Sequence, residues 1–446
     1  MRATTSGLFA AGLAVLSSPP AIAEPPEPVA TATVTSTTSA AAYRVPPEAL
    51  PGGPPWARAA LWVPRGLLAV LSALPRGIGW VIDELKLPAT FEAVFFDDTL
   101  TYGAFPVLTV ETPFGVQVGL RALHRSLFGQ GEQLRLAAQV GQRATELYSL
   151  DLDTGRRLGR TRVVARARFE RGSRLIYQGL NAPQGPRTEA RRRTVYARLR
   201  VERSFGPQLE GAVEVGWWND DYGPPLDDDV RSAETLSVPD PFTFRVEDID
   251  TLEGALEVIY DGQRSTAAFA PPAVPSEGLR LGARLGVDRV LENQGLTYMR
   301  YTLEVEQRFD LWRGTRILAV GARLSGVGGP IDRIPVFDLP ALGGPRHLRG
   351  FARGALRGPQ AFAAQVEYLF PLEPFVVGFL FADVGRTFTR LEDWRSGPEV
   401  SAGLGLEAYM WERSLGRLHL GVSGRGDVQF TFGVATDYNL DGRQDR

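Results

Sequence analysis

Cysteine is absent from the 446 residues, and lysine occurs once, at Lys86, so every other basic residue is arginine. A chain without cysteine has no disulfides and lacks the usual thiolate ligands of structural zinc sites. After residue 23 no apolar run reaches the roughly 20 residues that a membrane-spanning helix needs. The formal net charge of -2 argues against a nucleic-acid binder, which depends on a basic excess. Stability must therefore come from backbone pairing and packing.

The first 23 residues have the pattern of a cleaved secretory signal peptide. Arg2 is followed by an uncharged apolar run from Gly7 to Leu16, and then by Ala21-Ile22-Ala23. This small-x-small triplet is the pattern that signal peptidase cuts. We therefore assign residues 1–23 to a signal peptide and expect the mature chain to leave the cytoplasm.

Residues 24–88 differ from the rest of the chain in composition. Residues 24–55 are dominated by Pro, Ala, Thr and Ser, which cannot bury enough apolar surface to become ordered, so we predict a disordered periplasmic linker. Residues 56–88 contain two units that begin Pro-Arg-Gly and continue with apolar residues, a pattern that predicts two short amphipathic helices. These helices would lie on a lipid leaflet or inside a barrel, or alternatively pack against a barrel rim for structural reasons.

From residue 104 to residue 438 the hydrophobic pattern has a period of two. Apolar residues alternate with polar ones in, for example, residues 116–122, 134–140, 163–169 and 299–305, which predicts strands with one apolar and one polar face. A soluble β-sandwich also alternates. Strands of about ten residues or more, loops that are alternately short and long, and edge aromatics such as Trp217, Phe309 and Tyr409 favour a membrane barrel. We predict an all-β fold, a transmembrane antiparallel β-barrel of about 16 strands.

A barrel of this size encloses more volume than its own side chains fill, so we expect a loop in the lumen. The segment from Leu339 to Phe351 is the most conspicuous candidate. Here the chain resembles the bacterial surface antigen family, the BamA/TamA type of outer-membrane insertase and translocator barrels. The family's lumen loop has a Val/Leu-Arg-Gly-Tyr/Phe tip and its wall a Phe-x-Asp-x-Gly strand motif, matched by Leu348, Arg349, Gly350 and Phe351, and by Phe381, Asp383 and Gly385.

The residue chemistry agrees with this resemblance. Glu367 and Asp383 fall on the predicted lumen faces of adjacent strands, and Arg349 lies on a loop that can reach them. Because a guanidinium can bridge two carboxylates, we predict an Arg349 to Asp383 salt bridge with Glu367 as a second acceptor. Gly350 would let the tip turn tightly against the wall, and Phe351 would pack beside the pair. The alternative is that Arg349 is one of several pore-lining arginines.

Two features depart from the family pattern. Members of the insertase and secretion type carry periplasmic POTRA domains that bind client strands by edge pairing, whereas residues 24–88 lack the strand-helix-helix-strand-strand order of such a domain, and we predict none. At the other end, residues 439–446 form an acidic tail. Residues 437–445 match the start of the Asp-x-Asn-x-Asp-Gly calcium pattern, but the usual bidentate Glu is missing. We predict no metal, with a calcium site as the alternative.

No catalytic motif is evident. None of the three histidines has a metalloprotease spacing, and Gly421-Val-Ser-Gly-Arg lacks the final glycine of a nucleophile elbow. We predict no enzyme and no cofactor. The resemblance implies an outer-membrane barrel, its N-terminal segment and C-terminus periplasmic, that assists insertion or translocation of proteins or lipids. Its implied partners are outer-membrane lipid and client outer-membrane or secreted proteins, not nucleic acid. The alternative is a structural or passive-pore barrel with a plug loop and no client.

Overall fold

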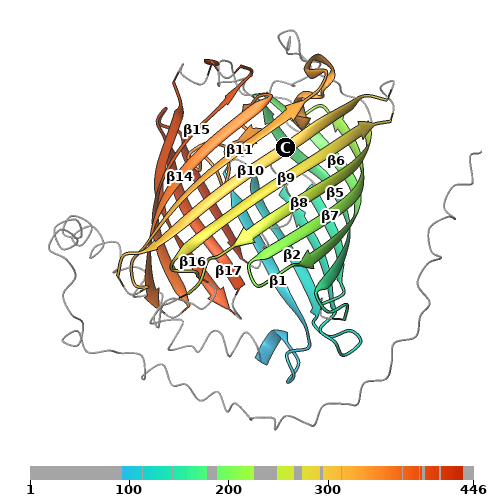
Figure 1. Cartoon of the computed structure of the whole chain (residues 1–446), viewed down its shortest axis with the longest axis vertical. Coiled ribbons are helices and arrows are strands. Elements are labelled where there is room, and N and C mark those ends of the chain that lie inside the picture. The colour runs from blue at the N-terminus through green and yellow to red at the C-terminus, as the bar shows by residue number, and fades with distance from the viewer. Residues whose placement is uncertain are drawn as a thin grey trace, which may run out of the picture. The chain divides into compact units, whose positions relative to one another are not determined.

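The computed structural model describes residues 93–434, except 113, 143–144, 156, 178–187, 226–248, 266–273, 292–294, 313, 374, 391, 394–396 and 411–412. Within these ranges 16 strands form one closed antiparallel barrel (Figure 1). Each strand pairs with its neighbours in chain order, apart from β12 and β13, which form a small sheet of their own. The predicted fold class and strand number are confirmed.

The barrel strands vary in length between 7 and 17 residues. Their bounds are β1 (Tyr102–Glu111), β2 (Gly115–His124), β3 (Gln133–Gly141), β4 (Thr145–Asp153), β5 (Thr161–Tyr177), β6 (Thr188–Ser204), β7 (Leu209–Gly223), β8 (Ile249–Asp261), β9 (Gly278–Val290), β10 (Thr297–Asp310), β11 (Ile317–Gly328), β14 (Gln360–Glu373), β15 (Val376–Phe388), β16 (Glu399–Met410), β17 (Arg413–Ser423) and β18 (Val428–Val434). The segment between β11 and β14 contains η5 (Ile331–Arg333), η6 (Val336–Asp338), β12 (Ala341–Leu342) and β13 (Leu356–Arg357).

Several predicted segments lie outside the described residues. They are the signal peptide (1–23), the linker (24–55), the helices (56–88) and the acidic tail (439–446) with its calcium pattern. The prediction that no POTRA domain is present also concerns residues that the structure does not describe. No helix in the described ranges is long and apolar enough to cross a membrane.

The strands alternate between an apolar outer face and a polar lumen face. On β10, Leu303 and Val305 are exposed on the outside, while Glu304 faces its register partner Arg323 on β11 and pairs with it at 3.3 Å. Tyr409 is a correction to the predicted edge aromatics, because it lines the lumen cavity instead. The reason is the period of two, which places Tyr409 on the same face as Glu407.

The wall is tallest where β5 and β6 pair, since both strands have 17 residues. Their register shifts once, between Arg171 and Ser173. Gly172 lies at this point with a φ of 75°, a left-handed conformation that glycine adopts without steric cost and that is typical of one class of β-bulge. The bulge therefore shifts the pairing of β5 with β6 by one residue beyond Arg171.

The segment between β11 and β14 fills the adjoining end of the barrel. Ile334, Val336, Phe337 and Leu339 are buried and pack against wall residues such as Tyr298. Tyr298 also donates a hydrogen bond from its hydroxyl to Asp338 at 2.8 Å. Burial of such side chains is worth roughly 1.5 to 3 kcal/mol each. The lumen loop predicted from the sequence is thus a packed part of the fold.

Candidate functional site

The tip of the lumen loop holds a buried arginine between two wall carboxylates. Arg349 is 1% exposed. Its Nη2 lies 2.5 Å from Asp383 Oδ1, its Nε donates to Asp383 Oδ2 at 3.0 Å, and its backbone N–H donates to Oδ2 at 2.9 Å. Nη1 contacts Glu367. The structure therefore brings together the three residues that the sequence singles out, with Glu367 on β14 and Asp383 on β15.

Further wall residues complete this arrangement. The guanidinium carbon of Arg349 lies 3.8 Å from the centre of the Phe381 ring. Ser401 donates its hydroxyl hydrogen to Asp383 at 3.2 Å, and Arg417 donates to Glu367 at 3.3 Å. Each carboxylate keeps a second donor, which matters because a buried charge with no partner costs several kcal/mol.

Two glycines let the loop tip approach β17. A Cβ atom on Gly350 would lie 2.5 Å from the backbone of Val422 and Ser423, and one on Gly421 would lie 2.4 Å from the carbonyl oxygen of Arg349. Gly350 lies in the predicted backbone turn, in which the Phe351 N–H donates to the Leu348 carbonyl at 2.9 Å, and the residue with a positive φ, 55°, is Leu348. A left-handed leucine costs about 1 to 3 kcal/mol, and it persists here because its side chain is fully buried.

The aromatic partner of Arg349 differs from the prediction. Phe351 does not contact the guanidinium but belongs to an apolar cluster with Leu348, Leu342 and Leu356. Phe381 takes the predicted place, because the period of two puts it on the same lumen face as Asp383. Gly385 leaves room for the cluster, since a Cβ there would lie 3.2 Å from Leu348.

The sequence analysis missed Ser401, Arg417 and Gly421. Arg417 is 50 residues from Glu367 along the chain, and only the strand order of the closed sheet brings them together. Gly421 was considered only as part of a serine motif. The local signal that could have pointed to these residues is their position on the lumen faces of β16 and β17.

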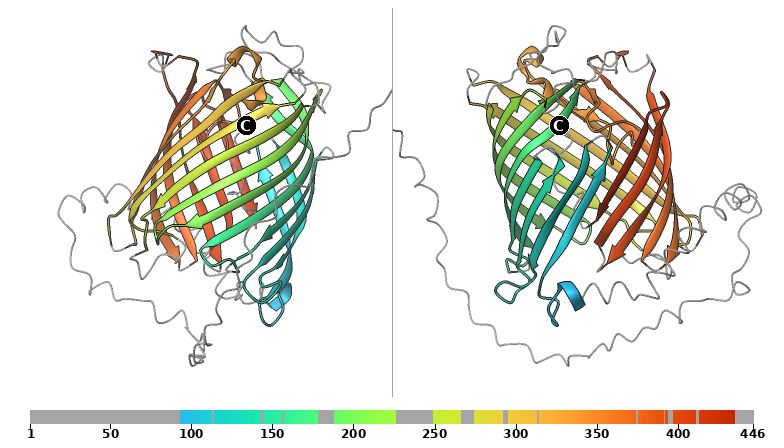
Figure 2. Two further views of the ribbon diagram at one scale, coloured as in Figure 1. Left: turned by 45° about the vertical axis from the view of Figure 1, so that its right-hand side comes forward. Right: turned by 180° about the vertical axis from the view of Figure 1, so that it is seen from behind.

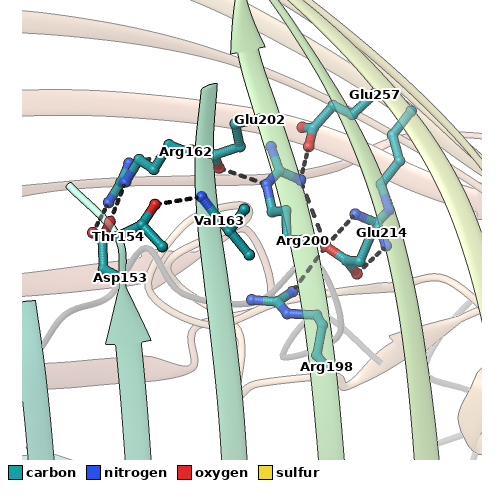
Figure 3. A network of polar contacts seen from close by, with 10 residues as sticks. Asp153, Thr154, Arg162, Val163, Arg198, Arg200, Glu202, Glu214 and Glu257 are labelled. Carbon is teal, nitrogen blue, oxygen red and sulfur yellow. Dashed lines mark hydrogen bonds and ion pairs between the residues drawn. The ribbon is translucent and has the colours of Figure 1, made fainter. Parts of the chain in front are cut away.

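Paired charges also cover the lumen wall from β5 to β9. Glu214 is buried and lies within 3.5 Å of Arg198, Arg200 and Arg284 (Figure 3). Arg200 also donates to Glu202 at 2.6 Å and contacts Glu257. Pairing satisfies charges that the lumen would otherwise leave poorly solvated.

A polar cavity of about 750 Å³ lies beside the loop tip. Its lining includes Arg308, Glu306, Arg417 and His419. The ring nitrogens of His419 have no hydrogen-bond partner among the described residues, and the ring meets Phe381 edge-on. No group of three or more His, Cys, Asp or Glu side chains suited to a metal ion occurs in the described ranges.

The junction between β1 and β18 closes the barrel. Among the described residues its register contains four pairs, from Leu108 with Val434 to Glu111 with Thr431, and all ten residues of β1 pair with β2. Figure 2 shows β1 beside the last strands in its right-hand view. We call this junction the seam. The loop reaches it directly, because Arg353 pairs with Glu111 at 2.5 Å.

A proline on β1 limits the seam. The Thr112 N–H donates to the Phe430 carbonyl at 2.9 Å, so the even-numbered residues of β1 direct their N–H groups toward β18. Pro106 has this parity, and proline has no N–H to donate. The described register of the seam ends at Leu108 with Val434, and Phe96 bridges Gly103. The seam therefore lacks one backbone donor at Pro106.

Comparisons with known proteins agree with this geometry. The chain matches the Omp85 superfamily domain over residues 126–436. It resembles the solved structure of BamA from Haemophilus ducreyi lacking POTRA domains 1-3, with 14% identity and a TM-score of 0.53, over 75% of this chain and 70% of that one.

Two further solved structures are similar over about the same part of the chain. CdiB from Acinetobacter baumannii has 14% identity and a TM-score of 0.47, over 75% of this chain and 60% of that one. CdiB from Escherichia coli has 13% identity and a TM-score of 0.49, over 74% and 62%. The chain therefore spans less than two thirds of either CdiB. No curated protein matches the sequence.

Proposed function

The chain belongs to the Omp85 superfamily, and we propose that it assists the insertion or translocation of proteins at the outer membrane through the seam between β1 and β18. Its clients would be outer-membrane or secreted proteins. In this proposal the end of the barrel that carries the lumen loop faces the cell exterior, and both termini lie on the periplasmic side.

The observation that carries the proposal is Pro106, which removes a backbone donor from the β18 side of β1. Each backbone hydrogen bond contributes about 0.5 to 1.5 kcal/mol net, so the missing donor lowers the cost of opening the seam. Once the seam is open, the free N–H and C=O groups of an edge strand can template another strand.

The lumen loop supports the same role because it contacts β1 on one side of the seam and β17, the neighbour of β18, on the other. Arg353 holds the end of β1 through Glu111, and Gly350 lies against β17 next to β18. Arg349 ties the loop to β14 and β15. A loop held in this way can keep the wall in shape while the seam opens.

A reversible cross-link tests the proposal. The chain has no cysteine, so Val110→Cys with Phe432→Cys, register partners across the seam, would introduce the sole disulfide. Paired residues on adjacent strands lie about 5.5 Å apart or less, within the range that disulfides span. Val118→Cys with Val140→Cys, register partners on β2 and β3, is the matched control.

The measurement is the folding rate of an added outer-membrane barrel client in lipid vesicles that contain the full chain. We expect the oxidised seam variant to lose the acceleration of client folding, reduction to restore it, and the control pair to have no effect. Equal acceleration with the seam locked would contradict the proposal and favour a passive-pore barrel with no client.

A further inference from the structure

Three arginines gather on the outer wall near the loop end of β5, β6 and β7. A concavity of about 340 Å³ is lined by Phe169, Arg171, Arg191, Arg193, Asp221 and Gly223. Gly223 leaves room for the Arg191 guanidinium, since a Cβ there would lie 3.3 Å from its Nη2. We call Arg171, Arg191 and Arg193 the arginine cluster.

The strand register concentrates positive charge at this place. Arg171 is the register partner of Arg193, and Arg191 lies two residues from Arg193 on the same face of β6. Like charges directly opposite each other on neighbouring strands destabilise a sheet. The Arg171–Arg193 register pair, with Arg191 beside it, therefore favours a negatively charged partner.

The lumen face of β5 and β6 also has an Arg–Arg register pair, and there carboxylates neutralise both arginines. Arg166 and Arg198 are also register partners. Arg166 pairs with Asp151, and Arg198 pairs with Glu214 at 3.4 Å. There, each arginine pairs with a buried carboxylate, and Arg198 shares Glu214 with Arg200 and Arg284.

On the outer face the charges of the arginines are balanced less closely by carboxylates. Arg193 lies 3.6 Å from Asp221, and both side chains are more than 40% exposed. Arg171 has Glu146 as its register neighbour on β4. Neither Arg171 nor Arg191 forms an ion pair with another residue in the described ranges. Two of the three arginines of the cluster thus have no ion-pair partner in the part of the chain that the structure describes.

The cluster lies at the edge of the apolar belt. On β6 the outer face between Arg193 and Arg203 contains Val195, Ala197, Leu199 and Val201. At 3.3 Å per residue and a strand tilt of about 40°, the two arginines are about 25 Å apart along the barrel axis, which is the height of the lipid-facing band of such barrels. The arginine cluster is therefore at headgroup level.

We propose that the arginine cluster binds the phosphate groups of a phosphorylated glycolipid of the lipid A class in the outer leaflet. This inference rests on the proposed function for the orientation of the barrel. Guanidinium groups bind phosphate oxygens in pairs through charge-assisted hydrogen bonds. Phe169 lines the side of the concavity toward the apolar belt, where it can contact the apolar part of the lipid. The phosphates neutralise Arg171 and Arg191, which form no ion pair within the described ranges.

Native mass spectrometry of the full chain in detergent tests the assignment. The probes are lipid A with two phosphates, lipid A with both removed, phosphatidylglycerol and inorganic phosphate. The variant is Arg171→Gln with Arg191→Gln and Arg193→Gln. Its matched control is Arg160→Gln with Arg203→Gln, which removes arginines at the opposite end of β5 and β6.

We expect the cluster variant to bind diphosphorylated lipid A at least about tenfold more weakly, because several charge-assisted contacts are lost. The control should bind it as the parent chain does, and dephosphorylated lipid A should bind weakly to all three. Unchanged binding by the cluster variant would overturn the proposal. Equal binding of phosphatidylglycerol, or occupation by inorganic phosphate instead of lipid, would overturn the assignment to this lipid class.

Two further measurements keep the result interpretable. Arg191→Gln alone leaves the Arg193 to Asp221 ion pair in place, and it should still weaken lipid A binding by about threefold, the effect of one lost contact. Heat-modifiability on gels checks that each variant is folded. Lipid binding is measured without any client, so loss of the lipid site and failure of the seam experiment are separate outcomes.

Discussion

Replacing Arg349 by alanine tests whether the loop tip is anchored by its buried charge. Arg349 is 1% exposed and contacts both Asp383 and Glu367. Removing one partner from a buried ion pair costs about 3 to 5 kcal/mol, and loss of the contact with the Phe381 ring adds about 1 to 2 kcal/mol. Ser401 and Arg417 still donate to the two carboxylates, so we expect a total near the lower bound, about 3 to 5 kcal/mol.

That magnitude corresponds to about two to three and a half orders of magnitude in the equilibrium between docked and undocked loop. The measurement is amide hydrogen exchange of residues 339–357 in the purified barrel, with protease protection and heat-modifiability alongside. The exchange rate in Arg349→Lys should lie between those of the parent chain and Arg349→Ala. Lysine keeps the charge, but it cannot bond to both carboxylates with a planar guanidinium.

Arg353→Ala is the matched control on the same loop. Arg353 pairs with Glu111 but is 40% exposed, and exposed pairs contribute only about 0 to 1 kcal/mol. If the loop exchanges no faster in Arg349→Ala than in Arg353→Ala, the anchoring role is refuted and Arg349 is one more arginine of the lumen wall.

Three further predictions concern single positions. Gly350→Ala should displace the loop tip from β17 and raise its protease sensitivity, because the added Cβ meets backbone at 2.5 Å, whereas Gly254→Ala, with nothing within 4 Å, should not. Glu214→Gln leaves Arg198, Arg200 and Arg284 without a shared carboxylate. The free energy of unfolding in urea should therefore fall by about 3 to 5 kcal/mol, and an unchanged midpoint urea concentration would contradict this. Pro106→Val adds an N–H on the β18 side of β1 and should stabilise the seam by about 0.5 to 1.5 kcal/mol, seen as slower client folding; faster folding would count against a seam that opens.

Alternation along the chain predicted the strands and their two faces, because it can be seen within each strand alone, and strand length, loop lengths and aromatics favoured a barrel over a sandwich. Residues 299–305 show which side chains meet lipid without any knowledge of their neighbours. The closing of the sheet follows from the same pattern, since a free edge has no hydrogen-bond partners in hydrocarbon. Tyr409 was misplaced because an aromatic near a strand end fits either an outer belt or a lumen wall, and only its parity with Glu407 decides.

The sequence predicted the ion pairs of the loop tip but not the packing of its aromatic side chains. Arg349, Glu367 and Asp383 carry charges that need partners inside a barrel, so their pairing could be expected from the sequence. Which phenylalanine contacts the guanidinium depends on the path of the loop, and the left-handed turn at Leu348 directs Phe351 into the apolar cluster.

The sequence by itself determined the strands, their two faces and the lumen arginine, because each depends on residue type and on spacing along one segment. Tertiary structure alone decided the properties that depend on register between strands. These are the pairing of β1 with β18 beside Pro106, the contact of Arg417 with Glu367, and the arginine cluster, in which Arg171 is the register partner of Arg193. Register is set by closure of the whole sheet, and a shift of one residue would move each of these side chains to the opposite face.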